Sequence, residues 1–447
     1  MKHVVRLHAG GLFMQTRKED IVDLPIRNAA VPPVAVVPMV QHEGEPSDCL
    51  VKVGDAVSEG MLIGKAKGHS GINIHSPIPG TVREIRTIPL HRGIESPAVV
   101  IDLGGEFDRL GKKVHKYPWK NLTRKELISL IADQGVVGMG GLGIPTRKKI
   151  ASLEGKTLET LIINGIESEP YLCSDYRVMV EKSPEVIQGI NILQKIMEPK
   201  RTILSVGRNR VKAWESLSAV LQEVPEQAES VELVLTEEKF PLGDETQLAK
   251  ALLKKKVTPG NPLIDFGVLV LNVSTVFAVY EGVVLRKPVM ERVVTLAGKA
   301  LARPANLKVR IGTPILGLVE ECGGFQVKPE KIICGGPFRG KGIFDLRTPL
   351  TKDITGVLFL TQEEIRAARR TACLNCGRCI TVCPVGLNPS RLFKWIDHGN
   401  FKEAIQEGLG DCIECGCCAF VCPARIPLVQ GLETGKQFAA RREGTDE

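Results

Sequence analysis

The chain has 447 residues, of which 43% are hydrophobic and 25% are charged, and its net charge is +8. This length exceeds what one hydrophobic core usually organises, and the composition excludes a disordered or fibrous protein. Lys and Arg are spread along the chain without an aromatic platform or a recognised binding motif, so we expect no nucleic-acid partner.

No segment of the sequence predicts a membrane span. The best candidate, 266–280, is shorter than the roughly 20 apolar residues required and is broken by Asn272, Ser274 and Thr275. It predicts a buried strand running into a helix. The first residues lack the apolar stretch of a secretory signal, so we expect a cytoplasmic protein without a transmembrane helix of its own.

Residues 1–115 alternate short apolar and polar runs, with turns at 54–55, 59–60 and 79–80. This pattern predicts a flattened barrel of hairpins of the barrel-sandwich type, like those of biotinyl and lipoyl carriers. The tip region reads His75-Ser76-Pro77 and offers no lysine for modification, which disfavours a carrier role. His42 and His75 either contact a cofactor or partner, or are ordinary polar residues of the barrel.

Residues 116–281 have a different texture. LTRKELISLIADQG predicts an amphipathic helix, with Leu127, Leu130 and Ile131 on one face and Thr123 or Asn121 as its cap. Strand and helix signals then alternate, which predicts a mostly parallel sheet covered on both faces. The strands are expected at 160–165, 201–207, 231–238 and 266–273, and the helices near 184–197, 211–222 and 245–255.

The glycine-rich stretch GVVGMGGLGIPTRKK lies in this segment, and Gly138, Gly140 and Gly143 spell G-x-G-x-x-G. A dinucleotide fingerprint requires a strand before the first glycine, whereas a predicted helix precedes this one. The glycines still allow close backbone approach to a flat or phosphorylated ligand, and a helix beginning near Pro145 offers N–H groups to an anion. The alternative is a tight turn between two helices.

Two acidic blocks follow predicted strands. In NGIESEPY, Glu167 and Glu169 flank a serine and would point to one side if extended, where they could hold ribose or amide groups; surface glutamates are the alternative. In FPLGDETQL, Asp244 and Glu245 precede a helix and also suit its dipole.

Eight of the thirteen cysteines form two copies of C-x2-C-x2-C-x3-C, each followed by proline. This spacing is typical of proteins with two [4Fe–4S] clusters, in which the fourth cysteine of each motif ligates the other cluster. The first cluster is expected on Cys373, Cys376, Cys379 and Cys422, and the second on Cys412, Cys415, Cys418 and Cys383. Two short helical patterns interrupted at 398–400 predict a helical two-cluster module over 362–447.

The blocks GVVGMGGLGIPTRKK, NGIESEPYLCSDYRVM, FPLGDETQL and LNVST occur in the order seen in the flavin-binding subunit of the complex I NADH dehydrogenase module. With a barrel before them and the double cysteine motif after them, the chain most resembles the C-type subunit of the Rnf ion-translocating electron-transport complex. Residues 282–325 are similar to the soluble-ligand-binding β-grasp (SLBB) module of these families, so that 282–361 are expected to form this domain and a return segment. The resemblance implies a multidomain α/β protein with a Rossmann-like flavin domain at 116–281.

The resemblance also implies an FMN site and NAD(H) as substrate. Gly138, Gly140, Gly141 and Gly143 would contact the flavin and its phosphate, with Lys149 near the ring system. Asn164, Glu167 and Glu169 would hold flavin or nicotinamide nucleotide. Gly243, Asp244 and Glu245 would lie on the NADH side, and Asn272 and Thr275 near the phosphate. The chain departs from the family at Leu142, Ile144, Ile166, Ser168 and Phe240, and Leu142 bears most directly on the fit of a flavin.

A hydride carries two electrons and an iron–sulfur cluster accepts one, so flavin would serve as the converter. The expected function is hydride exchange between NAD(H) and FMN in a ferredoxin:NAD+ oxidoreductase, with single electrons passing through two clusters. The chain would be peripheral on the cytoplasmic face of the membrane, bound to the other subunits of an ion-translocating complex, and would reach ferredoxin through an iron–sulfur subunit. The alternatives are a flavin and iron–sulfur cobalamin reductase and a non-catalytic electron-wiring subunit.

Overall fold

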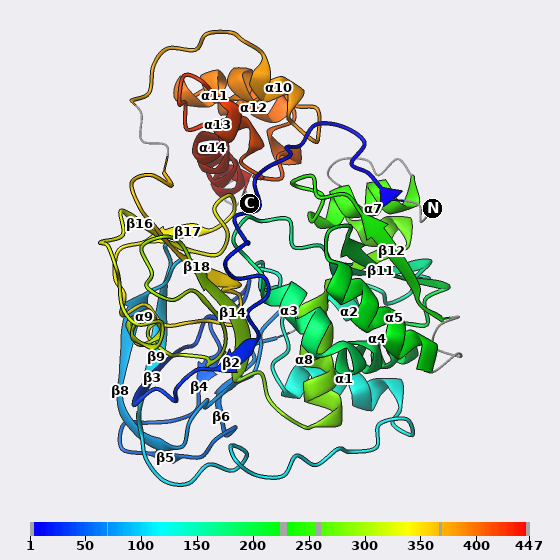
Figure 1. Ribbon diagram of the computed structural model, residues 1–447, viewed down its shortest axis with the longest axis vertical. Coiled ribbons are helices and arrows are strands. Elements are labelled where there is room, and N and C mark those ends of the chain that lie inside the picture. Colours follow the sequence, from blue (N-terminus) through cyan, green and yellow to red (C-terminus); the bar gives the residue numbers. More distant parts are fainter. Residues whose placement is uncertain (1–3, 69, 224–229, 255–260, 366–368, 444–447) are drawn as a thin grey trace.

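The computed structural model describes residues 4–68, 70–223, 230–254, 261–365 and 369–443. Figure 1 shows the parallel α/β region on the right, the N-terminal barrel at the lower left, the β-grasp region above it and the helical C-terminal module at the top.

The α/β region is built on a five-stranded sheet in which all neighbours are parallel. Its order is β1 (Val4–Val5), β12 (Glu232–Thr236), β11 (Arg201–Gly207), β10 (Thr160–Gly165) and β13 (Val268–Asn272). From β10 the chain adds β11 and then β12 on one side, and it then returns to add β13 on the other side of β10. In an open parallel sheet, ligands bind at the carboxyl ends of the strands near such a reversal.

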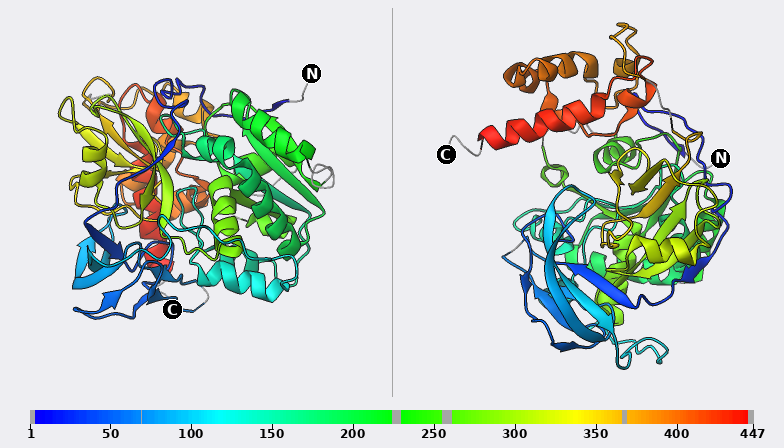
Figure 2. Two further views of the ribbon diagram at one scale, coloured as in Figure 1. Left: turned by 60° about the horizontal axis from the view of Figure 1, so that its bottom comes forward. Right: turned by 90° about the vertical axis from the view of Figure 1, so that its left-hand side faces the viewer.

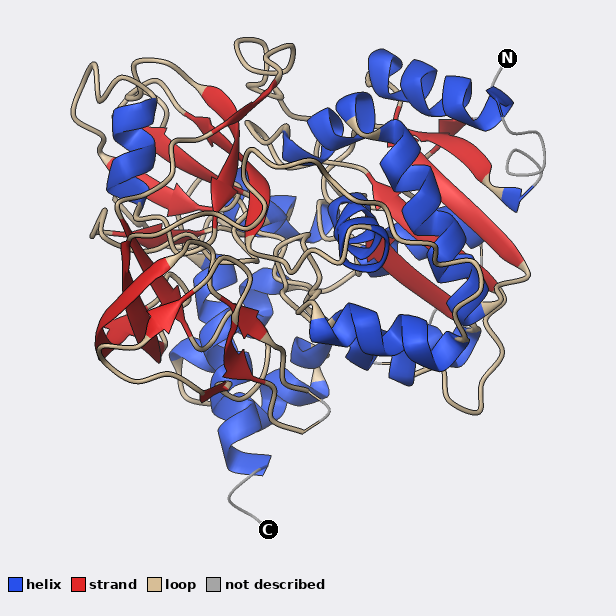
Figure 3. Ribbon diagram, turned by 90° about the horizontal axis from the view of Figure 1, so that it is seen from below, coloured by secondary structure: helices blue, strands red, loops and turns tan. Residues whose placement is uncertain are grey.

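Helices cover both faces of this sheet (Figure 3). Leu161 and Ile163 of β10 pack in one core with α4 (Ser183–Met197) and α8 (Val273–Val284), whereas Ile162 packs on the opposite face with α7 (Glu245–Leu253). The remaining helices are α1 (Arg124–Asp133), α2 (Thr146–Ala151), α3 (Ser174–Glu181) and α5 (Val211–Glu223). The predicted strand-to-helix transition at 266–280 corresponds to β13 and α8.

Helix α1 begins where its sequence predicts. The Thr123 hydroxyl accepts a hydrogen bond from the Glu126 N–H, and the Glu126 carboxylate accepts one from the Thr123 N–H at 2.7 Å. This reciprocal pair satisfies two N–H groups that have no partner inside the helix. Leu127 and Ile131 are fully buried on its inner face.

The barrel consists of two antiparallel sheets. One has the order β3 (Val34–Pro38), β9 (Glu95–Leu103), β8 (Gly80–Pro89) and β5 (Ala56–Val57), and the other β4 (Asp48–Cys49), β6 (Leu62–Lys65) and β7 (Ile74–His75). Figure 2 shows these strands curling around one another. His42 and His75 are both buried within this region.

The β-grasp region is a six-stranded sheet packed on helix α9 (Ile315–Glu321). Its order is β17 (Lys341–Ile343), β16 (Lys331–Cys334), β18 (Gly356–Leu360), β14 (Glu291–Ala297), β15 (Ala305–Arg310) and β2 (Ile26–Asn28). The helical module contains α10 (Arg378–Thr381), α11 (Pro389–Asp397), α12 (Phe401–Gln406), α13 (Cys417–Val421) and α14 (Leu428–Glu443). The predicted interruption at 398–400 separates α11 from α12.

Residues 4–28 differ from the rest of the expected first module because their strands join other sheets. β1 pairs with β12 of the α/β region, and β2 pairs with β15 of the β-grasp region. Between them, Gly11 N–H donates to the Val382 carbonyl of the helical module at 2.9 Å. In Figure 1 this N-terminal strap, residues 4–28 (dark blue), runs past the helical module and down between the other regions. A strand of two or three residues shows no period that would predict its partner sheet.

No helix among the described residues combines the length and apolarity needed to cross a bilayer.

Candidate functional site

The glycine bend, residues 138–143, closes on itself and packs against the start of α8. Gly138 N–H donates to the Ile144 carbonyl at 2.7 Å, and Gly143 N–H donates to the Gly138 carbonyl at 3.2 Å. Gly141 and Gly143 have φ angles of 107° and 68°, in the region that favours glycine. A Cβ added to Gly140 would lie 3.1 Å from Asn272 Cβ, so only glycine allows this approach without adjustment.

The start of α8 receives the bend through polar contacts. Met139 N–H donates to Thr275 Oγ1 at 2.9 Å, and Asn272 caps the helix by accepting from Ser274 N–H at 2.9 Å. The structure therefore brings together the bend, Asn272 and Thr275. Helix α2, after the bend, has only six residues, and its first N–H, on Thr146, already donates to the Val136 carbonyl.

Asn164 and Gly243 meet at the carboxyl end of β10. Asn164 Nδ2 donates to the Gly243 carbonyl at 2.9 Å, while its Oδ1 accepts from Ile166 N–H at 3.0 Å. A Cβ on Gly243 would lie 2.8 Å from Ser168 Oγ, which explains the glycine at this crossing of two loops.

Glu167 and Glu169 face different partners, so the expectation that they point to one side is wrong. The Glu167 carboxylate accepts from Asp175 N–H at 3.1 Å at the start of α3. The Glu169 carboxylate accepts from the N–H groups of Phe338 and Arg339, each at 3.1 Å, and its burial raises its pKa. The chain bends at 169–171, beginning at Glu169, and leads into α3, so the two carboxylates meet different elements.

Asp244 and Lys149 are also engaged by protein groups. Asp244 caps α7 and forms an ion pair with Arg339 at 2.8 Å. Lys149 Nζ lies 2.5 Å from Glu245 Oε1 and donates to the Val270 carbonyl, so its ammonium group is engaged by α7 and β13. These contacts favour a supporting role for Lys149 and Asp244.

Asp175, which sequence reasoning did not single out, lies at the centre of this arrangement. Its carboxylate accepts from Asn272 Nδ2 at 2.6 Å and from Ser274 Oγ at 2.5 Å. Burial, with the nearby Glu167 carboxylate, raises the pKa of Asp175. An acid shortly after the NGIESEPY block was the available signal, but the sequence did not predict that helix α3 begins there.

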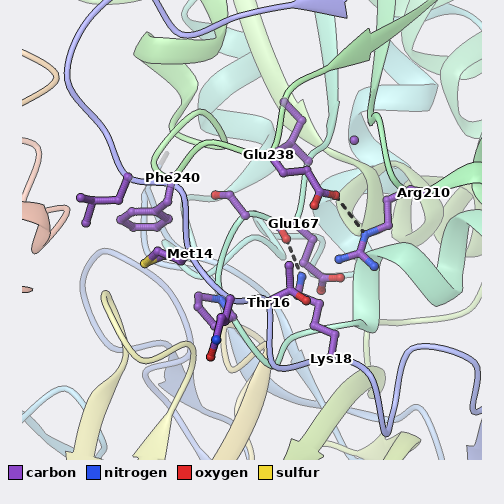
Figure 4. Close-up of a pocket in the computed structure, with 13 residues that line it drawn as sticks. Met14, Thr16, Lys18, Glu167, Arg210, Glu238 and Phe240 are labelled. Atoms are coloured by element: carbon purple, nitrogen blue, oxygen red, sulfur yellow. Dashed lines mark hydrogen bonds and ion pairs between the residues drawn. The ribbon is translucent and has the colours of Figure 1, made fainter. Parts of the chain in front are cut away.

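A pocket opens at the carboxyl ends of β10 and β11, beside this arrangement (Figure 4). Residues 12–18 of the N-terminal strap form one wall. The buried Lys18 Nζ donates to the Glu167 carbonyl at 2.6 Å, and Arg210 faces Glu238 at 3.7 Å. Phe240 provides an aromatic side. Nothing in the local sequence of the strap predicts that it reaches this sheet edge.

The second expected set of cysteines shares one apolar pocket. Its walls include Cys383, Cys412, Cys415 and Cys418, and also Cys417. Cys383 comes from the first motif and the others come from the second, so the fold brings together the cross-ligating set that the spacing predicts. Leu387 N–H lies 3.3 Å from Cys383 Sγ, the kind of donor that stabilises a thiolate. These thiols fit a cluster of several irons. Among the described residues, no group of three or more His, Cys, Asp or Glu side chains lies close enough together to hold a single metal ion.

The first expected set is more open. Cys373, Cys379 and Cys422 pack with Phe393 in one group of hydrophobic side chains, and Cys376 is exposed. Cys418 of the second set belongs to the same group of side chains, as expected for two iron–sulfur sites sharing one small module. Of the cysteines outside the two motifs, Cys173, Cys322 and Cys334 are buried, whereas Cys49 is exposed.

An aromatic contact joins the sheet edge to the second thiol set. The rings of Phe240 and Phe338 have centroids 4.6 Å apart, and Phe338 lies 5.3 Å from Phe420. Phe240, Cys415 and Cys417 belong to one hydrophobic cluster with Phe338 packed against it. Arg339 Nη2 also donates to the Ile413 carbonyl at 3.2 Å. The second thiol set is therefore continuous with the carboxyl edge of the sheet.

Family models match in chain order: the RnfC barrel sandwich hybrid domain over residues 7–106, the Nuo51 FMN-binding domain over 131–281, the SLBB domain over 293–340 and a 4Fe–4S dicluster domain over 372–426. Fold and site thus define a flavin and iron–sulfur oxidoreductase subunit with FMN and two [4Fe–4S] clusters as cofactors.

Curated relatives identify the family. The C-type subunit of the proton-translocating ferredoxin:NAD(+) oxidoreductase complex of Clostridium ljungdahlii is 35% identical over 89% of this chain and 86% of its own. The C-type subunit of the ion-translocating oxidoreductase complex of Rhodobacter capsulatus is 36% identical over 97% of this chain and 83% of its own. That of the Na(+)-translocating ferredoxin:NAD(+) oxidoreductase complex of Acetobacterium woodii is 31% identical over 97% of this chain and 98% of its own. The chain belongs to the RnfC family, the C-type subunits of the Rnf-type ion-translocating oxidoreductase complexes.

Among solved structures, an NAD+-reducing [NiFe]-hydrogenase in the H2-reduced state matches with a TM-score of 0.51 at 17% identity, covering 74% of this chain and 68% of that one. This likeness supports the fold.

Proposed function

We propose that this chain is the NAD(H)-reactive subunit of a ferredoxin:NAD+ oxidoreductase complex and lies on the cytoplasmic face of the membrane. Bound FMN would supply the conversion between the two-electron chemistry of the nicotinamide and the one-electron chemistry of the clusters. The other subunits would couple this transfer to ion translocation and would connect the chain to ferredoxin. The names of its relatives support this assignment.

The observation that carries the proposal is the continuity of the carboxyl sheet edge with the second thiol set. The bend at Gly138–Gly143, with Asn272 and Thr275, is proposed to hold the flavin. Asn164, Glu167 and Gly243 would shape the nicotinamide side, next to the pocket of Figure 4. Electrons would pass between this edge and the cluster on Cys383, Cys412, Cys415 and Cys418, because the contact of Phe240 with Phe338 connects the edge to that thiol set.

Within this site the protein would orient the bound flavin and nicotinamide. The glycines let the backbone approach a flat ring, and the cap at Asn272 fixes the start of α8 under the bend. Glu169 and Asp244 would act indirectly, by holding the 338–339 loop against the sheet edge. Hydride transfer needs no side-chain acid or nucleophile, and none is assigned.

The test is cofactor content combined with a dye-reduction assay on the full chain after anaerobic reconstitution. We expect about eight iron atoms for two [4Fe–4S] clusters, and FMN released by acid in a one-to-one ratio with protein. NADH should reduce an artificial acceptor only when FMN is present. A chain loaded with iron that binds no flavin would contradict the proposal and leave a wiring subunit, whereas cob(II)alamin reduction would favour the cobalamin reductase.

A further inference from the structure

The carbonyl groups of the glycine bend are held by donors from outside the α/β region. Arg92 of the barrel donates through Nη2 to the Gly141 and Leu142 carbonyls, at 3.3 and 3.1 Å. Arg292 of β14 donates to the Met139 carbonyl at 3.1 Å. Glu43 N–H of the barrel donates to the Gly143 carbonyl at 3.2 Å.

Fixing these carbonyls also fixes the amide groups between them. In a trans peptide the C=O of one residue and the N–H of the next point in opposite directions. Holding the Met139 carbonyl therefore turns the Gly140 N–H away from β14, and holding the Gly141 carbonyl turns the Leu142 N–H away from the barrel. Within the described ranges, the N–H groups of Gly140, Gly141 and Leu142 have no hydrogen-bond partner.

The space beside these amides is open. A Cβ on Gly141 would meet no atom of the described residues within 4 Å, and the Leu142 side chain is half exposed. Successive free N–H groups in a bend form a concave site for oxygen atoms with negative charge. The bend thus presents its donors to a ligand because its acceptors are occupied on the other side.

Arg92 is itself anchored by a buried carboxylate. Its guanidinium lies 2.6 Å from Asp353, which precedes β18 of the β-grasp region, and Asp353 is buried while also bonding His91 at 3.0 Å and the Thr351 hydroxyl at 2.6 Å. The Nε and Nη2 atoms of Arg92 both face Asp353 Oδ2, at 2.8 and 2.6 Å, and Nη2 also donates to the two carbonyls of the bend. Two nitrogens on one carboxylate set the plane of the guanidinium, and a lysine, with a single nitrogen, is not oriented in this way.

We propose that Arg92 of the barrel is a positioning residue for the flavin, because it holds the bend so that the Leu142 N–H, beside the free N–H groups of Gly140 and Gly141, faces an oxygen atom of the cofactor. This inference rests on the proposed function and gives the barrel a role in it. The oxygen belongs either to the FMN phosphate or to a ring carbonyl.

The experiment compares R92Q, R92K and R83Q in the full, cluster-loaded chain. Arg83 is a matched control because it lies on the same barrel and pairs with Asp102 at 3.0 Å on the surface. The dissociation constant of FMN, from quenching of flavin fluorescence, should rise about 10- to 100-fold in R92Q and less in R92K, and should be unchanged in R83Q. Iron content should stay at the parental value in all three, which separates positioning from unfolding.

Riboflavin distinguishes the two oxygen sources. If the amides hold the phosphate, R92Q loses affinity for FMN but not for riboflavin; if they hold the ring, it loses both. If the parental protein binds FMN and the dissociation constant of R92Q lies within twofold of the parental value, this inference alone is overturned. Parental protein that binds no FMN would overturn the proposed function instead. Should R92Q lose iron, R92K decides, because FMN affinity equal to the parent's in that variant contradicts positioning by the fork.

Discussion

Lys352 is a fully buried lysine whose ammonium group has no carboxylate partner within the described part of the chain. Its Nζ donates to the carbonyls of Gly135 at 2.8 Å and Asn73 at 3.1 Å, and so joins the barrel to the segment that leads into the glycine bend. Burial lowers the pKa of Lys352 to about 7. Above neutral pH the folded chain therefore binds this proton less tightly than the unfolded chain does.

The pH dependence of stability follows from this difference. Between pH 7 and the ordinary lysine pKa near 10.4, the unfolded state holds more protons, so the unfolding free energy rises with pH, by at most about 1.4 kcal/mol per unit. Well below pH 7 the contribution is constant. Lys352→Met should abolish this rise. We would compare thermal midpoints of parent and variant from pH 6.5 to 9.5, with the exposed Lys156→Met as control; parallel profiles for parent and K352M would contradict the assignment.

Residue by residue, the sequence singles out the glycines, Asn272 and the cluster cysteines, because the roles expected of them depend on local backbone geometry or spacing. It does not predict Arg92, Asp175 or Lys352. Their partners lie 49, 97 and 217 positions away in the chain, and no local pattern marks a buried cation or acid. The divergence of Glu167 and Glu169 also depends on partners in separate elements.

At the scale of elements, the two cysteine motifs make a prediction about pairing. If the motifs cross-ligate, Cys383→Ala and Cys412→Ala should remove the same cluster signal in electron paramagnetic resonance spectra, and Cys422→Ala and Cys373→Ala the other. Cys417→Ala should retain both signals, because the spacing selects Cys418. Grouping of Cys383 with Cys373 instead would show that each motif ligates its own cluster.

Elements with a long apolar period were predictable, and short ones were not. Helix α1 carries its own capping box, and β10 to β13 are continuous apolar runs joined by helices. Helix α3 has eight residues, and six of them are buried, so no polar face reveals its period. The strands β1 and β2 are shorter still, and their sheets are chosen by tertiary contacts alone.

At the scale of the molecule, the strap of residues 4–28 connects three regions that the sequence shows as separate modules. At its contact with the helical module, a Cβ on Gly10 would lie 2.6 Å from the Cys383 carbonyl carbon, and Gly10 has a φ of 61°. The strap therefore lies directly over the backbone of a predicted cluster ligand.

Gly10→Ala should lift the strap from this position and expose the nearby cluster. We expect the visible iron–sulfur absorbance to bleach faster in air than in the parental chain, because solvent and oxygen reach the sulfur ligands more readily. Gly54→Ala is the matched control, since Gly54 also has a positive φ, of 91°, but no atom of the described residues lies within 4 Å of an added Cβ. Equal bleaching rates for G10A and the parent would show that the strap does not shield the cluster.

The strap also constrains the order in which the chain can fold. Its residues leave the ribosome before their partners in β12, β15 and the segment near Cys383, which are synthesised more than 200 residues later. At elongation rates of about 5–20 residues per second, about ten seconds or more pass between the synthesis of β1 and that of its partner strand β12. The strap is thus made before the strands that it joins, and it can dock only after they have been synthesised.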